Sequence, residues 1–431
     1  MYNKLEKKNF CDCMVLNLWP AVNYGAMLTC FGLQCLLEDM GLNVRIINYI
    51  FDIKQNKNYS KSFAKPFADK YLKLTKPIKT HDDFCALNDI CSTFIVGSDQ
   101  VWRRRIMNSH HSGTTSTTYL LDFVKSGNKK LSYAGSFGSG LTDVTDEEKE
   151  LFKYFLSQFD DISVREEDAA NIIDSFGLDN TLLIDGAFLI PHKVLDEMTK
   201  DYQSDEKYVA FFTLPYFKKS GIQKEIAQKI ADEKGLPLKE MIFDSKISME
   251  QWLSYLKNAQ FVVSDSYHAT VMSIIFNVPF VQVVNAKLTQ SRFETLFNLL
   301  GLENNSIDIE NSEEIDFSKL FAPIDWDKVN KKIEKEVGRS RDWLEKAFKK
   351  DVKPVNKTID AINKIIAERE ILKDKYAKDV KLCANSGYIS RKYYKYKLLS
   401  KLTFGKKRKY YKSRRDAFKK HVRFIRANLW K

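Results

Sequence analysis

The sequence lacks a hydrophobic run long enough to cross a membrane, and it lacks a full Gly-x-Gly-x-x-Gly motif. Its longest apolar stretch, residues 261–284, is interrupted by Asp265 and His268. Residues 1–8 contain no hydrophobic segment of a secretory signal, so we expect a protein that is made and kept in the cytoplasm. The missing glycine motif argues against a bound dinucleotide, and we expect no cofactor.

Paired cysteines and metal-ligand clusters are also lacking. The seven cysteines are an odd set that lies mostly in apolar segments, which favours buried thiols in a reducing compartment over a disulfide framework. Cys11 and Cys13 are two residues apart, but no second pair of Cys or His at ligand spacing accompanies them. We therefore expect no metal site.

Acidic residues are nearly absent from the end of the chain. Residues 391–431 contain 17 Lys and Arg and one acid, Asp416, so residues 1–390 sum to −3 in a chain whose formal charge is +13. Apolar side chains interrupt this basic tail, and four of them recur on one helix face, as in a helix that lies on a membrane surface. These four are Phe418, Val422, Ile425 and Leu429.

The sequence does contain a regular alternation of strand and helix patterns, and it is long enough for two or three domains. An apolar run at 13–19 is followed by a loop, a helical pattern at 26–40 and a second strand at 44–49. This is the β-loop-α-β unit of a parallel, doubly wound sheet. Further strands are expected at 93–96, 130–133, 162–164 and 181–184, with helices near 145–159 and 166–176.

A second α/β series begins after the polar stretch 199–207. Its strands are expected at 208–212, 238–243, 261–263 and 280–284, and its helices at 221–233, 248–258, 269–276 and 291–300. We therefore predict two Rossmann-like domains that face each other across a cleft. The predicted parts are an N-terminal domain at 1–195, a C-terminal domain at 200–305, a helical connecting segment at 306–390 and the basic amphipathic tail at 391–431.

Ligands of open α/β sheets bind beyond the carboxyl ends of the strands, so the loops there should converge on the cleft. These loops hold Asn-Tyr-Gly at 23–25, Gly-Ser-Asp-Gln-Val-Trp at 97–102, Ala-Gly-Ser-Phe-Gly at 134–138, Ser-Val-Arg-Glu at 163–166 and Ser-Asp-Ser-Tyr-His at 264–268. In this order and spacing the chain resembles the polysaccharide pyruvyl transferase family over roughly residues 10–305.

The resemblance implies a GT-B-like fold, phosphoenolpyruvate as donor on the C-terminal domain, and a pair of sugar hydroxyls as acceptor on the N-terminal domain. The product is then a pyruvate ketal, with release of phosphate. Many family members carry an Arg two residues before the motif histidine and a Gly after it, where this chain has Ser266 and Ala269. The cations that could replace this Arg at the donor are Lys218, Lys219 and Arg292. A Ser-Phe-His triplet in some branches is similar to Ser266 and Tyr267 followed by His268.

His268 is the strongest candidate for a general acid, because this chemistry must deliver a proton to the methylene carbon of the donor. It lies where a strand ends and a helix starts, and the N–H groups of a helix start also favour an anion. The alternative is a structural histidine that packs under the helix and bonds to a carbonyl.

Asp99 and Arg165 follow two other strands of the first domain. Asp99 could orient or deprotonate an acceptor hydroxyl, or it could be a turn or N-cap residue. Arg165 could bind the carboxylate of the donor through two hydrogen bonds, or it could pair structurally with Glu166 or Asp185.

The remaining candidates are expected on the acceptor side. Tyr24 and Trp102 could stack on a sugar, although packing in the core is the other common use of aromatic residues. Asn23 and Gly25 would let the start of the first helix approach a ligand closely, and Gln100 lies beside them in the converging loops.

Three functions remain open at this point. The first is a pyruvyl transferase that acts on a bacterial surface polysaccharide or its lipid-linked precursor, and the second is a glycosyltransferase that uses a nucleotide sugar. The third is a non-catalytic adaptor for membrane or nucleic acid. Lipid-linked glycans are assembled at the cytoplasmic membrane face, so we expect the tail to bind anionic lipid, at about 1 kcal/mol per basic residue, and not nucleic acid.

Overall fold

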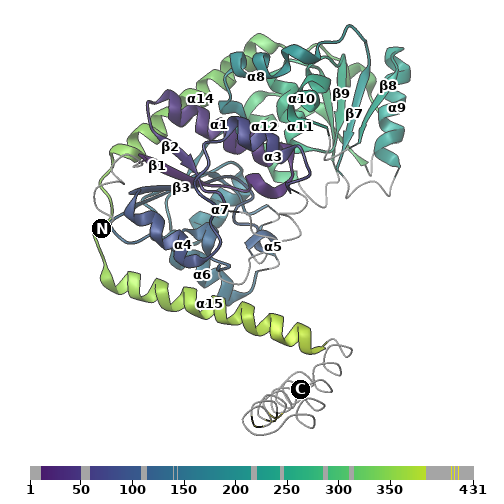
Figure 1. Ribbon diagram of the computed structural model, residues 1–431. Helices are drawn as coiled ribbons and strands as arrows, with labels where there is room; N and C mark the ends of the chain where they lie inside the picture. Colours follow the sequence, from purple (N-terminus) through teal and green to yellow (C-terminus); the bar gives the residue numbers. More distant parts are fainter. Residues whose placement is uncertain are drawn as a thin grey trace. The chain divides into compact units, whose positions relative to one another are not determined.

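The computed structural model describes residues 11–49, 59–107, 114–138, 140–142, 144–214, 221–242, 247–284, 290–309 and 315–384, and the single positions 409, 412 and 416. Both sheets lie in one compact unit, which comprises residues 1–110 and 114–364. The predicted architecture of two Rossmann-like domains is confirmed, because each domain has a parallel sheet covered by helices (Figure 1).

The first domain is built on six parallel strands in the order β2-β1-β3-β4-β5-β6. The strands are β1 (Cys13–Leu16), β2 (Val44–Ile46), β3 (Thr93–Asp99), β4 (Lys129–Gly135), β5 (Asp161–Val164) and β6 (Thr181–Leu182). The helices are α1 (Tyr24–Asp39), α3 (Ala64–Tyr71), α4 (His81–Ala86), α5 (Arg104–Met107), α6 (Asp146–Leu156), α7 (Glu167–Ser175) and α8 (His192–Thr199). Every residue of β1, β3 and β4 is buried, as expected for strands that helices cover on both faces.

The second domain has five parallel strands in the order β11-β10-β9-β7-β8. The strands are β7 (Val209–Thr213), β8 (Leu238–Ile242), β9 (Phe261–Ser264), β10 (Phe280–Val284) and β11 (Ser306–Asp308). The helices are α9 (Ile222–Lys234), α10 (Met249–Lys257), α11 (Tyr267–Ile275), α12 (Gln290–Leu300) and α13 (Phe317–Leu320).

Side-chain caps fix where several of these helices begin. Thr145 and Ser248 form capping boxes at the starts of α6 and α10, where the third residue of each helix returns a hydrogen bond. Asn23 and Ser266 cap α1 and α11, and each accepts a hydrogen bond from the backbone N–H three residues later. These last two caps place the two helix starts that matter for the site.

Two long helices follow the second sheet. Helix α14 (Trp326–Lys349) contacts α12 of the second domain and the short 3-10 turn η5 (Gly186–Leu189) of the first, so it packs on both. The buried amine of Lys129 donates hydrogen bonds to the carbonyls of Ala347, Phe348 and Lys350 at 2.6–2.7 Å, which holds the end of α14 on the first domain. Helix α15 (Lys357–Ala384) begins beside Ser126, which binds Asp360.

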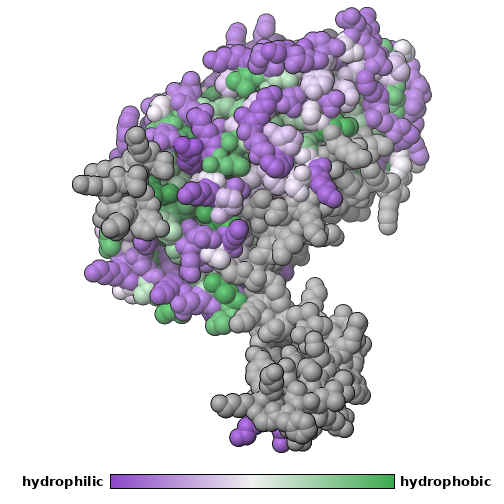
Figure 2. All heavy atoms as spheres, in the orientation of Figure 1, coloured by the Kyte–Doolittle hydropathy of each residue, from purple (hydrophilic) through white to green (hydrophobic). Residues whose placement is uncertain are grey.

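The apolar residues of the described chain are gathered in the interior, and the face shown in Figure 2 is mostly hydrophilic. Among the described residues, no helix combines the length and the apolar character needed to cross a membrane. The predicted amphipathic face at 418–429 lies outside the described residues.

Candidate functional site

The starts of α1 and α11 meet where the two domains touch, and α12 lies beside them (Figure 1). We call this contact the seam: α1, α7 and the ends of β3, β5 and β6 on the first domain, and α10, α11 and α12 on the second. Tyr24 and Trp252 stack across it with ring centroids 4.6 Å apart, and the backbone N–H of Glu167 donates to the Thr295 hydroxyl at 3.2 Å. The carboxyl ends of both sheets therefore contribute residues to one place.

His268, the second residue of α11, lies directly on Gly25 of α1. An ideal Cβ at Gly25 would be 1.9 Å from the Nδ1 atom of His268, so the imidazole fills the space that any other residue would use for its side chain. The residue is 9% exposed, and α11 holds it at the helix start where backbone N–H groups and the helix dipole favour negative charge.

The other ring nitrogen of His268 faces a carboxylate of the first domain. Its Nε2 atom is 3.8 Å from Oδ1 of Asp185, which is too long for a full hydrogen bond. Among the described residues Nε2 is buried without a hydrogen-bond partner. Among the described residues, Nε2 therefore makes no hydrogen bond to a carbonyl.

Arg165 is the centre of a buried ion network. Its Nη2 donates to Asp99 at 2.9 Å and its Nε to Glu166 at 3.4 Å, and its Nη1 contacts Asp185. Burial would lower the pKa of Arg165, but these three carboxylates raise it above its usual range. Burial also raises the pKa of Glu166. At Asp185 burial would likewise raise the pKa, but the positive charge of Arg165 outweighs it and holds the pKa of Asp185 well below its usual range.

Tyr267 lies beside two cations. The guanidinium carbons of Arg165 and Arg292 are 5.2 and 5.4 Å from the centre of its ring, within the range of cation–π contact. Burial and the charge of Arg165 lower the pKa of Arg292, and among the described residues it is Arg165 that forms the close ion pairs with the carboxylates. Among the described residues, the close ion pairs with these carboxylates are therefore those of Arg165 and not of Arg292.

The predicted acceptor residues are in the same region, but two of them are core residues. Trp102 is 1% exposed, and its indole N–H donates to the carbonyl of Tyr119 at 3.1 Å. Tyr24 is buried between Phe63 and Trp252, and its hydroxyl donates to the carbonyl of Ile247 at 2.9 Å. Neither ring can stack on a sugar in this arrangement, so the core-packing alternative describes both.

Other predicted residues have structural partners at the edge of the site. Asn23 is exposed and caps α1, and Gln100 accepts a hydrogen bond from Arg103 at 2.9 Å. Ser266 caps α11. Lys218 and Lys219 lie outside the described residues.

Two carboxylates were missed as site candidates. Asp185 follows β6, and Asp265 follows β9, so each had the same strand-end signal that identified Asp99. Asp265 accepts hydrogen bonds from the Thr213 hydroxyl at 2.7 Å and from the backbone N–H of Leu214 at 2.9 Å. Burial raises its pKa to about 6, so it titrates close to neutral pH.

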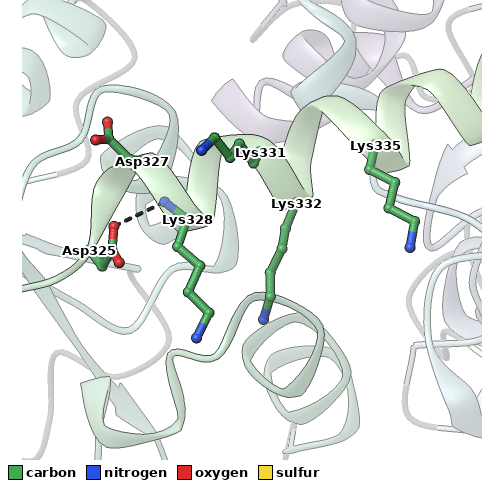
Figure 3. A pocket seen from close by; sticks show the side chains of 6 residues that line it. All are labelled: Asp325, Asp327, Lys328, Lys331, Lys332 and Lys335. Atoms are coloured by element: carbon green, nitrogen blue, oxygen red, sulfur yellow. Dashed lines mark hydrogen bonds between the residues drawn. The ribbon is translucent and has the colours of Figure 1, made fainter.

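A small cavity borders the site, and a wider hollow lies elsewhere, along α14. A cavity of about 30 Å³ touches Arg165, Asp185 and Tyr267, which is room for a buried water and not for a sugar. A wider hollow of about 540 Å³ lies along α14, where Asp325 caps the helix by accepting a hydrogen bond from the backbone N–H of Lys328 (Figure 3). The lysines of this second hollow are Lys328, Lys331, Lys332 and Lys335.

No group of three or more His, Cys, Asp and Glu side chains within the described ranges is arranged to hold a metal ion. The seam itself presents an imidazole, carboxylates and guanidinium groups at two helix starts.

Several solved structures are similar in fold at low sequence identity. UDP-GlcNAc 2-epimerase from Neisseria meningitidis is 11% identical with a TM-score of 0.45, over 78% of this chain and 98% of that chain. A putative UDP-N-acetylglucosamine 2-epimerase from Listeria monocytogenes is 10% identical with a TM-score of 0.46, over 80% and 99%. ADP-heptose lipopolysaccharide heptosyltransferase II from E. coli is 9% identical with a TM-score of 0.35, over 75% and 99%.

No curated protein sequence matches this chain significantly. The family model for polysaccharide pyruvyl transferase matches residues 23–286, a range that starts at the cap of α1 and includes both helix starts of the seam. This range is more than half of the chain, and the protein therefore belongs to the polysaccharide pyruvyl transferase family.

Proposed function

We propose that the protein transfers the pyruvyl group of phosphoenolpyruvate to two hydroxyls of one sugar, in a bacterial surface polysaccharide or its lipid-linked precursor. The placement of His268 carries this proposal. A histidine of the second domain lies at a helix start, against a helix start of the first domain, with Arg165 and Arg292 on the neighbouring Tyr267. An anionic donor that must be protonated needs this combination of a proton donor and cations.

The reaction has two steps in this proposal. One acceptor hydroxyl adds to the carbon of the donor that bears the phosphate, while the double bond takes a proton from His268 at its methylene end. The hydroxyl proton leaves to a carboxylate. The second hydroxyl then takes the place of phosphate on the same carbon: the C–O bond to phosphate breaks, the second C–O bond forms, and the hydroxyl proton leaves with the inorganic phosphate as the ketal closes. No cofactor is needed, since the donor supplies its own activated carbon.

We assign the following roles, which the positions of the described residues support. Arg292 binds the anionic groups of the donor, with Ser266, Tyr267 and the start of α11 beside it, and Lys218 and Lys219 are further candidates for this role. Asp99, whose side chain is 12% exposed, accepts the acceptor proton. Arg165 is enclosed by its three carboxylates, so it supports the site and does not bind the donor directly.

The test uses purified full-length protein with phosphoenolpyruvate and a panel of lipid-linked sugars. We expect inorganic phosphate to appear in a one-to-one ratio with a sugar whose mass and carbon NMR spectrum show a pyruvate ketal. If the protein ignores phosphoenolpyruvate and consumes a nucleotide sugar to form a glycosidic bond, the proposal is wrong and the chain is a glycosyltransferase. If it consumes neither, the adaptor hypothesis gains support.

We also propose that residues 391–431 attach the protein to the inner face of the cell membrane. Their 17 basic residues and single acid support attraction to anionic lipid, and the apolar residues between them support partial insertion. This location would bring the site close to a lipid-linked acceptor.

A further inference from the structure

We infer that Asp185 is a positioning residue: its carboxylate faces Nε2 of His268 from across the seam and pairs with the imidazolium, so that Nδ1 is the nitrogen that gives its proton to the substrate. This inference rests on the proposed function for the step that it serves. The orientation of the ring, however, can be tested without any activity.

The Asp185 carboxylate is fixed from one side. Its Oδ2 contacts Arg165 and lies 3.5 Å from the Ser98 hydroxyl, and its Oδ1 accepts a hydrogen bond from the backbone N–H of Ala187 at 2.9 Å. These bonds leave Oδ1 turned toward His268. The side chain is completely buried, which strengthens the interactions of that oxygen.

The imidazole has an unused hydrogen-bonding position on the side that faces Oδ1 of Asp185. Its Nε2 is buried without a hydrogen-bond partner among the described residues, and Asp185 Oδ1 is 3.8 Å away. A shift of about 1 Å would give a charge-assisted hydrogen bond between imidazolium and carboxylate. On the other side of the ring, Nδ1 lies over Gly25 at the start of α1.

The charged groups around His268 come from several elements. Asp99, Glu166 and Asp185 contact Arg165, and Arg292 lies with Arg165 on the ring of Tyr267. The starts of α1 and α11 add a positive potential of their own. Among these groups, Asp185 is the carboxylate that faces the imidazole.

The pair also joins the two domains. Asp185 belongs to the first domain and His268 to the second, so the contact exists only when the domains are packed as they are here. The position of the His268 ring relative to Asp185 therefore depends on how the two domains pack against each other.

The test is the isosteric variant Asp185→Asn, which removes the charge and keeps the shape. With ¹⁵N-labelled histidine, and the His268 signals assigned by their loss in His268→Gln, we expect the ring nitrogens of His268 to deprotonate at lower pH in Asp185→Asn than in the unmodified protein. In ketal formation, the decline of kcat/KM at high pH should move to lower pH by about one unit. Asp160→Asn is the matched control, because Asp160 is also a buried carboxylate of the first domain but binds Lys130 and Lys353 away from the seam.

Identical titration of the His268 nitrogens in both proteins would overturn the inference, whatever the activity shows. A fall in kcat/KM at every pH, with no movement of the profile, would also overturn it, because a merely structural carboxylate would act in that way. If Asp185→Asn does not fold, Asp185→Glu replaces it: its longer side chain moves the carboxylate relative to Nε2, so the NMR signal of Nε2 should change, and an unchanged Nε2 signal would overturn the inference. If no phosphoenolpyruvate-dependent activity exists at all, the NMR titration still decides the role of Asp185.

Discussion

The imidazole of His268 occupies the space that a side chain on Gly25 would need, since an ideal Cβ at Gly25 would be 1.9 Å from Nδ1, 2.2 Å from Cγ and 2.6 Å from Cε1. Gly25 belongs to the first domain and His268 to the second, so this contact brings two distant sequence motifs into one site. The glycine is required for close approach and not for an unusual backbone angle.

Gly25→Ala should therefore displace the histidine without unfolding the first domain. We expect turnover to fall by roughly 100-fold, because a misplacement of about 1 Å has this effect on proton transfer. The rate of ketal formation measures turnover, and circular dichroism shows whether the protein is still folded. Gly338→Ala in α14 is the control: its Cβ would meet nothing within 4 Å, and its activity should be normal. Full activity of Gly25→Ala would show that the position of the ring is unimportant.

His268→Ala should lower turnover by roughly two to four orders of magnitude, which is the usual contribution of a general acid. The measurement is single-turnover ketal formation at saturating donor, with folding checked by thermal unfolding. His192→Ala is a suitable control, since His192 starts α8 and has no part in the seam. Near-normal turnover in folded His268→Ala would remove this residue from the mechanism.

Arg292→Ala should weaken donor binding while leaving the ion network of Arg165 in place. Phosphoenolpyruvate stabilises the native state that binds it, so it should raise the melting temperature of the unmodified protein, and this shift should shrink in Arg292→Ala. A double alanine variant at Lys218 and Lys219 tests the other two cations in the same assay. Lys331→Ala, on the surface of α14, is the control. An undiminished shift in Arg292→Ala would exclude it from the donor site.

Asp265→Asn should stabilise the protein at neutral pH. The pKa of Asp265 is raised to about 6 in the folded protein, above the value of about 4 for an unfolded chain, so the native state binds the extra proton and loses stability as pH rises from about 4 to 6. Asparagine does not ionise, so Asp265→Asn does not lose stability in this way as the pH rises. We expect a gain of about 1–3 kcal/mol in the free energy of unfolding above pH 6, which disappears near pH 4. Denaturant unfolding across this range measures it, and a gain independent of pH would contradict the ionisation argument.

Deleting residues 391–431 changes the formal charge from +13 to −3. The shortened protein should lose binding to vesicles that contain anionic lipid, and it should still act on a soluble acceptor analogue, because the seam lies outside the deleted segment. Binding of the full chain should weaken with salt without vanishing, since apolar insertion is not screened. Tight binding of RNA or DNA at physiological salt, with no binding to vesicles, would show that the tail serves another partner.

The two α/β series could be recognised from the sequence because parallel strands are short apolar runs and their helices follow with a different period. The helix predicted at 26–40 is α1 at Tyr24–Asp39, and the helix predicted at 291–300 is α12 at Gln290–Leu300. The early helices α3 and α4 were not predicted, because they are short and carry several charged residues. Strand ends also identified Asp99, Arg165 and His268 as neighbours, since the carboxyl ends of parallel strands share one edge.

Only the tertiary structure decided what these neighbours do to one another. Asp185 and Arg165 are 20 residues apart and His268 is in another domain, so no local pattern shows that one carboxylate touches both. The same holds for Trp102 and Tyr24. From the sequence alone, each ring could stack on a ligand or pack in the core, and the tertiary contacts bury both. The physical reason is that periodicity reports which face of an element is covered, whereas a pairing between side chains depends on how two domains are placed in space.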